Sequence, residues 1–95
     1  MKVSEITITD VANYLKLNDG EYGVSELDSI LYASKAFIKS YTGLNDDEID
    51  THEDIYIVVM ILCQDMYDTR SLYVDKTNLN KVVETILGMH SINLL

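Results

Sequence analysis

The feature that most constrains this chain is an uninterrupted apolar run of nine residues near its middle, from Ile55 to Cys63. Nine residues fall well short of the roughly 20 that a helix needs to cross a bilayer. A helix that is apolar on every side is instead typical of the buried centre of a bundle. The run becomes amphipathic afterwards and ends in Tyr-Asp-Thr-Arg at residues 67–70. We therefore expect a central helix from Ile55 to about Arg70, around which the rest of the chain packs.

Helical spacing of apolar residues predicts three further helices, over Val11–Leu17, Ser25–Thr42 and Leu79–Met89. Thr9 or Asp10 is expected to cap the first helix, and Gly43 suits the left-handed position that ends the second. The sequence has no proline, and we find no repeat or low-complexity linker, so residues 1–95 are predicted to form a single domain. The predicted fold class is all-α: a small bundle of about four helices with a buried central helix.

Tyrosine dominates the aromatic content, with seven Tyr against one Phe. Helical spacing assigns three of them to core-facing stripes: Tyr14, Tyr41 and Tyr67. Tyrosine is also favoured where a contact is half wet. The remaining four are therefore candidates for surface contacts: Tyr22, Tyr32, Tyr56 and Tyr73. In the last helix, the stripe assigned to the core consists of Leu79, Val82, Val83, Ile86 and Leu87.

Acidic residues outnumber basic ones by 16 to 7, which gives a net charge of −9. This balance leaves no basic footprint for nucleic-acid phosphates. The acids are densest in the connection Asn45–Asp54, where Thr51 is expected to cap the central helix. Cys63 is the only cysteine, so one chain can form neither a disulfide nor a cysteine-based zinc site, and we expect this thiol in the core. The N-terminus lacks the long apolar stretch of a secretory signal, so synthesis in the cytosol and no membrane association are expected.

No pattern for catalysis or metal binding emerges. Asp65 and Asp68 share a helix face, but the matching Glu-x-x-Glu pair of a small metal-dependent hydrolase is missing. His52 and His90 have no partners at ligand spacing, and the last helix ends near His90, whose ring can cap its carbonyls. The acidic connection lacks the central glycine of a calcium loop, and there is no glycine-rich phosphate loop. We expect no cofactor.

The order of these pieces resembles a known family. A short helix precedes a longer one that ends in Tyr-Thr-Gly at residues 41–43, and a hydrophobic helix follows that ends in Tyr-Asp-Thr-Arg at residues 67–70. A loop, a last helix and an apolar tail complete the chain. From about Ile8 to Leu95, the sequence resembles the small head–tail connector proteins of long-tailed bacteriophages and prophages, also described as head-completion or DNA-packaging proteins. The acidic connection has no counterpart that we can match to a family function.

The resemblance implies an all-α structural protein without a catalytic role. Such proteins assemble as a ring beneath the capsid portal, extend the channel through which DNA passes and present a platform to the tail or to a stopper protein. The expected location is accordingly the head–tail junction (the neck) of the virion, with assembly in the bacterial cytoplasm. If acidic residues line the channel, like-charge repulsion would keep DNA from adhering as it slides through.

Closing a ring requires two different patches on each copy. We place the contacts at the end of the central helix, in the loop Ser71–Asn78 and in the C-terminal tail. The candidate interface residues are Tyr56, Arg70, Leu72, Tyr73, Val74, Leu94 and Leu95. Arg70, the only arginine, has two readings: an ion pair within the chain that fixes the following loop, or a salt bridge to the neighbouring subunit.

Two other function classes remain open at this point. An acidic regulatory or DNA-mimicking module would stay monomeric or dimeric and would bind a basic partner with strong salt dependence. A small metal hydrolase would need magnesium and would lose activity on Asp65→Asn or Asp68→Asn.

Overall fold

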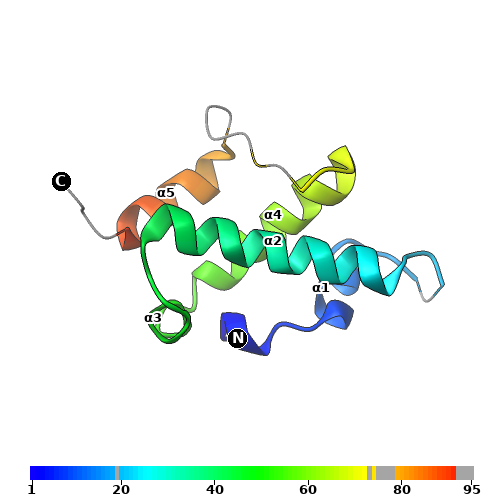
Figure 1. Cartoon of the computed structure of the whole chain (residues 1–95), viewed down its shortest axis with the longest axis horizontal. Coiled ribbons are helices and arrows are strands. Elements are labelled where there is room, and N and C mark those ends of the chain that lie inside the picture. The colour runs from blue at the N-terminus through cyan, green and yellow to red at the C-terminus, as the bar shows by residue number, and fades with distance from the viewer. Residues whose placement is uncertain (19, 73, 75–78, 92–95) are drawn as a thin grey trace.

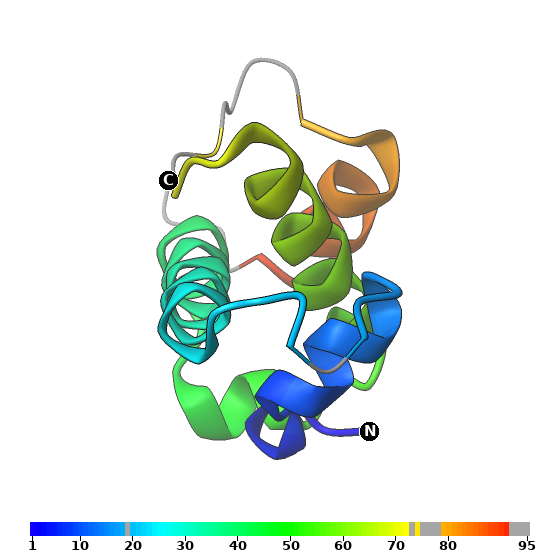
Figure 2. The ribbon, with the colours of Figure 1, turned by 90° about the vertical axis from the view of Figure 1, so that its right-hand side faces the viewer.

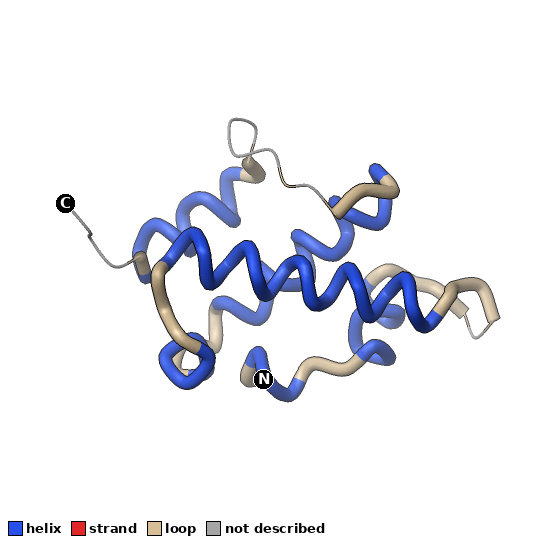
Figure 3. Tube along the Cα trace, viewed as in Figure 1, coloured by secondary structure: helices blue, strands red, loops and turns tan. Residues whose placement is uncertain are grey.

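The structure, a computed structural model, describes residues 1–18, 20–72, 74 and 79–91, and all regular structure within them is helical (Figure 1; Figure 3). The elements in chain order are a 3-10 turn η1 (Val3–Glu5) and the helices α1 (Ile8–Tyr14), α2 (Val24–Thr42), α3 (Asp46–Asp50), α4 (Ile55–Thr69) and α5 (Lys81–His90). The predicted small all-α bundle is confirmed. One core cluster draws buried side chains from every one of these elements.

Helix α4 is the centre of the bundle, as its apolar run predicts. It contacts η1, α1, α2 and α5. Figure 2 shows α4 lying between α2 on one side and α5 on the other. Seven of its side chains are buried: Ile55, Val58, Val59, Met60, Leu62, Cys63 and Met66. The helix can be apolar on nearly every side because neighbours cover it from several directions.

Helix α2 is the longest element and lies along one side of α4. Leu27, Ile30, Leu31 and Ile38 form its buried stripe. Two hydroxyl groups on this face are also buried, but each bonds to the preceding turn: Ser34 donates to the Leu31 carbonyl and Thr42 to the Ile38 carbonyl. The helix ends as predicted at Gly43, whose φ of 77° is easily adopted only by glycine.

Several predicted helix starts are wrong by one to three residues. Helix α1 begins at Ile8, because Thr7 rather than Thr9 or Asp10 is its cap: the Thr7 hydroxyl accepts from the Asp10 N–H, and the Asp10 carboxylate accepts from the Thr7 N–H. This reciprocal capping box satisfies two backbone donors at once. The helix also ends early, at Tyr14, since Lys16 takes a left-handed conformation with φ of 60°.

The acidic connection contains a short helix that the sequence analysis misses. Helix α3 is capped by Asn45, which accepts from the Glu48 N–H while the Glu48 carboxylate accepts from the Asn45 N–H. Its one buried side chain is Ile49. The expected cap of the central helix is wrong for the same reason: Thr51 ends α3 by donating to the Glu48 carbonyl.

Two residues assigned to the core face outward. Tyr14 is 39% exposed and Val82 is 47% exposed. On α5, only Val83 and Leu87 are fully buried. The helix is too short and too peripheral to bury the wide apolar stripe that its sequence carries, so part of the stripe faces solvent.

Candidate interaction surface

Three of the predicted interface residues lie together where α4 ends. Arg70, Leu72 and Val74 follow α4 directly and border hollows on the surface of α2. Tyr56 is separate from them: it lies in the first turn of α4, roughly 20 Å from Arg70 along the helix, and is half-buried against the core. The predictions for three further residues fall outside the described part of the chain: Tyr73, Leu94 and Leu95.

An open hollow of about 710 Å³ runs along α2 where Leu72 and Val74 approach it. We call it the α2 groove and define it by its apolar and aromatic lining: Tyr32, Ala33, Ala36, Phe37, Leu72 and Val74. Tyr32 is 77% exposed and Leu72 is 55% exposed. Scattered exposed apolar residues are ordinary, whereas a contiguous apolar patch in a hollow is a candidate for an interaction site. Of the four tyrosines predicted to reach the surface, Tyr22 and Tyr56 are half-buried against the core, and Tyr32 is the one that belongs to this groove.

Arg70 fixes the direction in which the chain leaves α4. It adopts the left-handed conformation with φ of 56°, the Ser71 N–H donates to the Met66 carbonyl, and the Arg70 N–H donates to the Tyr67 carbonyl. These bonds form a Schellman-type helix end, which usually contains glycine. The guanidinium pairs with Glu26 of α2 and lies 4.3 Å from the centre of the Tyr67 ring. The described structure therefore uses Arg70 as an ion pair within the chain.

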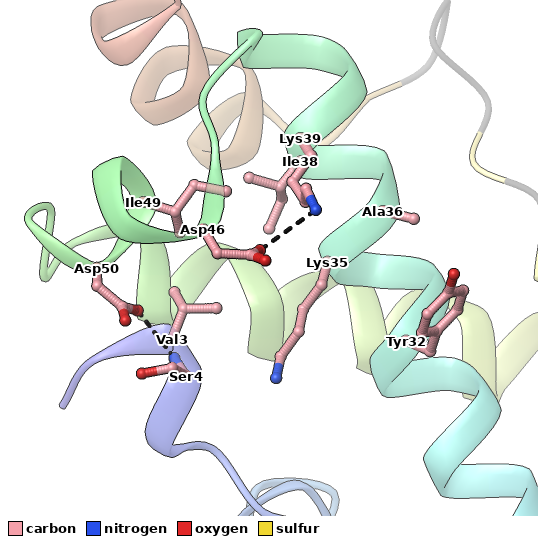
Figure 4. A pocket seen from close by; sticks show the side chains of 10 residues that line it. All are labelled: Val3, Ser4, Tyr32, Lys35, Ala36, Ile38, Lys39, Asp46, Ile49 and Asp50. Atoms are coloured by element: carbon pink, nitrogen blue, oxygen red, sulfur yellow. Dashed lines mark hydrogen bonds and ion pairs between the residues drawn. The ribbon is translucent and has the colours of Figure 1, made fainter.

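A second hollow, of about 370 Å³, separates η1, α2 and α3 (Figure 4). Polar contacts join the elements around it: Lys39 of α2 lies 3.4 Å from Asp46 of α3, and the Ser4 N–H donates to Asp50 at 3.0 Å. Lys35 projects from α2 beside the hollow (Figure 4). These contacts link α3 and η1 to the long helix across the surface of the bundle.

Hydrogen bonding makes Asp50 a stronger acid than usual. Ser4, through its hydroxyl and its backbone N–H, lowers the pKa of Asp50 below the ordinary value of 3.8. The positive charges of Lys2 and Lys35 act in the same direction. Each of these contacts favours the ionised carboxylate. Asp50 is therefore an anchor for the N-terminal turn.

The structure also brings together two histidines that are far apart in sequence. The rings of His52 and His90 stack with centroids 3.9 Å apart, and His90 Nε2 lies 2.8 Å from Asp54 Oδ2. His90 thereby ties the end of α5 to the segment between α3 and α4. We call this cluster of His52, Asp54 and His90 the α3–α4 junction. The predicted role of His90 as a cap of its own helix is wrong, because the ring bonds to Asp54 instead.

Helix α5 carries a second exposed apolar feature. Val82 and Met89 are 47% and 65% exposed, and a spacing of seven residues places them on the same side of the helix. Lys81 precedes them at the start of α5. We call Lys81, Val82 and Met89 the α5 ridge. The sequence analysis assigns Val82 to the core stripe and gives Met89 no role, although their spacing of seven residues is visible in the sequence.

Other residues with possible chemistry have ordinary surroundings. Cys63 is buried beside the Ser34 hydroxyl at 3.6 Å, and burial raises the pKa of its thiol, which confirms its assignment to the core. Asp68 accepts two hydrogen bonds from Gln64, and Asp65 is exposed. Within the described residues, no three His, Cys, Asp or Glu side chains converge to hold a metal ion. None of the helices described here combines the length and apolar character that crossing a membrane requires.

Comparisons of the chain with protein-family models, with curated proteins and with solved structures give no match. The class of protein that the structure itself defines is a small helical bundle with an acidic composition and an apolar groove along its longest helix.

Proposed function

We propose that this chain is a structural assembly protein, a phage or prophage head–tail connector that forms a homo-oligomeric ring between the portal and the tail. The observation that carries the proposal is the α2 groove, in which Leu72 and Val74 from the predicted contact segment meet the exposed Tyr32. Apolar side chains in such a hollow are favourable only when another surface covers them. In this role the chain has no reaction to catalyse and needs no cofactor.

The ring would surround DNA without binding it specifically. The net charge of −9 supports this role, because a negative channel wall repels phosphates and lets the duplex slide. Its partners would be the portal on one side and a tail or stopper protein on the other. The site of action would be the virion neck, after assembly in the bacterial cytoplasm.

The test is the oligomeric state, measured by mass photometry and sedimentation velocity, first with the chain alone and then with the portal protein encoded in the same genome. A discrete ring-sized species in either sample is the expected result. A chain that stays monomeric and never engages the portal would overturn the proposal.

An acidic regulatory or DNA-mimicking module is the second candidate, and helix α3 favours it. Five consecutive residues there, Asp46 to Asp50, include four carboxylates, and three of these are exposed. Such a module would bind a basic partner, with an affinity that falls steeply as salt rises from 50 to 500 mM. The connector, which uses apolar contacts, would show a much weaker dependence on salt.

A further inference from the structure

We propose that the α5 ridge of one copy docks into the α2 groove of the next, so that a second copy of this chain is the occupant of the groove. This inference rests on the proposed function, because it names the two unlike patches that a closed ring needs. It is carried by the placement, shape and charge of these two patches.

The first argument is placement. In Figure 2, α4 lies between α2 and α5, and α2 and α5 also contact each other. Tyr32 and Leu72 are exposed on the α2 side, and Val82 and Met89 are exposed on α5. A ring requires each copy to meet two neighbours through two different surfaces, and two patches made of different residues on different helices satisfy that requirement.

The second argument is shape. The α2 groove is hollow because Ala33 and Ala36 leave room between larger side chains, whereas Val82 and Met89 project from α5. Small residues on one helix allow another helix to approach closely, and an amphipathic helix in an apolar groove is a recurrent mode of recognition. The groove extends from Asp28 to Ser40, roughly 18 Å of helix, while α5 is roughly 15 Å long. The ridge is therefore short enough to lie along the groove.

The third argument is charge. Asp28 contributes the one charged side chain among the described residues that line the groove, and it lies at the groove's N-terminal end. Lys81 lies at the N-terminal end of the ridge. Eight residues separate Asp28 from Ala36, and eight separate Lys81 from Met89. With the two helices parallel, a Lys81–Asp28 pair therefore places Met89 over Ala36, which fixes the register of the contact.

Disulfide trapping tests this register directly. Ala36→Cys and Met89→Cys are prepared as separate proteins that carry tags of different mass, and they are oxidised mildly, alone and mixed, with and without the portal. Cys63 does not compete, because its thiol is buried and its pKa is raised. The expected result is a covalent dimer of mixed mass in the mixture and none from either variant alone. Dimers of either variant with itself, or no dimer in the mixture, would overturn the inference.

A charge exchange tests the pairing without relying on cysteine. Asp28→Lys and Lys81→Asp should each weaken self-association at least tenfold, and the double variant should recover to within about threefold of the original. Asp47→Lys, on the exposed surface of α3, is the control for the change in net charge, and circular dichroism verifies the fold of each variant. A double variant as weak as the product of the two single effects would contradict the pairing.

The outcomes separate this inference from the proposed function. A ring-sized species that forms without the mixed disulfide would overturn the ridge-in-groove contact and leave the connector intact. A chain that forms no assembly, alone or with the portal, would overturn both.

Discussion

The α2 groove and the α3–α4 junction are both surface features, yet they differ in whether their side chains have partners within the chain. At the junction, His90 bonds to Asp54 and stacks on His52, so these polar side chains have partners within the chain. In the groove, Tyr32 and Leu72 remain more than half exposed. Polar groups that are satisfied internally stabilise a fold, whereas exposed apolar side chains gain free energy only from another molecule. The comparison favours a structural role for the junction and agrees with the proposed interaction role of the groove.

The largest effect is expected from placing a charge in the groove. Ala36→Glu should weaken assembly at least a hundredfold, because an unpaired carboxylate would be buried when the groove is covered. The free energy of unfolding should change by only about 0.5 kcal/mol, since Ala36 is exposed in the isolated chain. Sedimentation velocity measures the assembly, and urea denaturation measures the stability.

Asn13→Glu is the matched control, because it adds the same charge at an exposed position of α1 away from the groove. It should leave assembly within about twofold of the original. Equal losses in both variants would mean that net charge, rather than the groove, controls assembly, and the comparison would then fail.

The helical framework could be predicted because it depends on local signals. The apolar run at Ile55–Cys63 locates the central helix, and Gly43 ends α2 where its backbone preference indicates. Helix α3 was missed, since five residues with one buried side chain carry almost no periodicity. The spacing of Asn45 and Glu48 is nevertheless that of a capping box, which is a sequence signal for a helix start.

The candidate surface could be predicted only in part. Leu72 and Val74 are predicted as contacts because they follow Arg70 in sequence, and that prediction stays open. The opposite wall of the groove that they line belongs to α2, and packing alone brings the two walls together. The His52–His90 stack could not be predicted for the same reason: its two residues are 38 positions apart, and only packing brings them together. Val82 was assigned to the core because a stripe of apolar residues does not reveal which of its members a neighbouring helix covers.

A smaller effect, on stability alone, is expected at the junction. His90→Ala removes both the bond to Asp54 and the ring stack, which should lower the free energy of unfolding by about 1–2 kcal/mol, as read from urea denaturation. Amide exchange should accelerate most at the end of α5. His52→Ala is the matched control: it removes the stack but keeps the bond, so it should cost less than His90→Ala. A loss of assembly in a folded His90→Ala protein would place the junction in the interface after all.

Arg70 shares a property with each region: like the junction it makes an ion pair within the chain, and like the groove it borders a hollow together with Leu72. Its variants therefore allow a finer test. Arg70→Ala and Arg70→Gly both remove the pair with Glu26, which is exposed and worth about 0–1 kcal/mol. The glycine variant should nevertheless be more stable than the alanine variant by about 1 kcal/mol, because only alanine keeps the strain of the left-handed backbone. Thermal and urea unfolding measure the difference. If both variants fold but lose assembly, Arg70 bonds a neighbouring subunit in the ring, and its pair with Glu26 belongs to the free chain only.

The smallest effect is expected at Asp50, where the outcome depends on pH. Because its pKa is lower in the folded chain than the ordinary 3.8, the folded state holds the ionised carboxylate more favourably than the unfolded state does. This contribution is complete above about pH 5 and is lost as the pH falls through the folded pKa. Asp50→Asn should therefore be slightly less stable than the original at pH 7, and the gap should close towards pH 3 in urea midpoints. Assembly should be unchanged at pH 7, because the Ser4–Asp50 bond joins η1 to α3 and does not reach the groove. A gap that widened on acidification would show that Asp50 is not the anchor of the N-terminal turn.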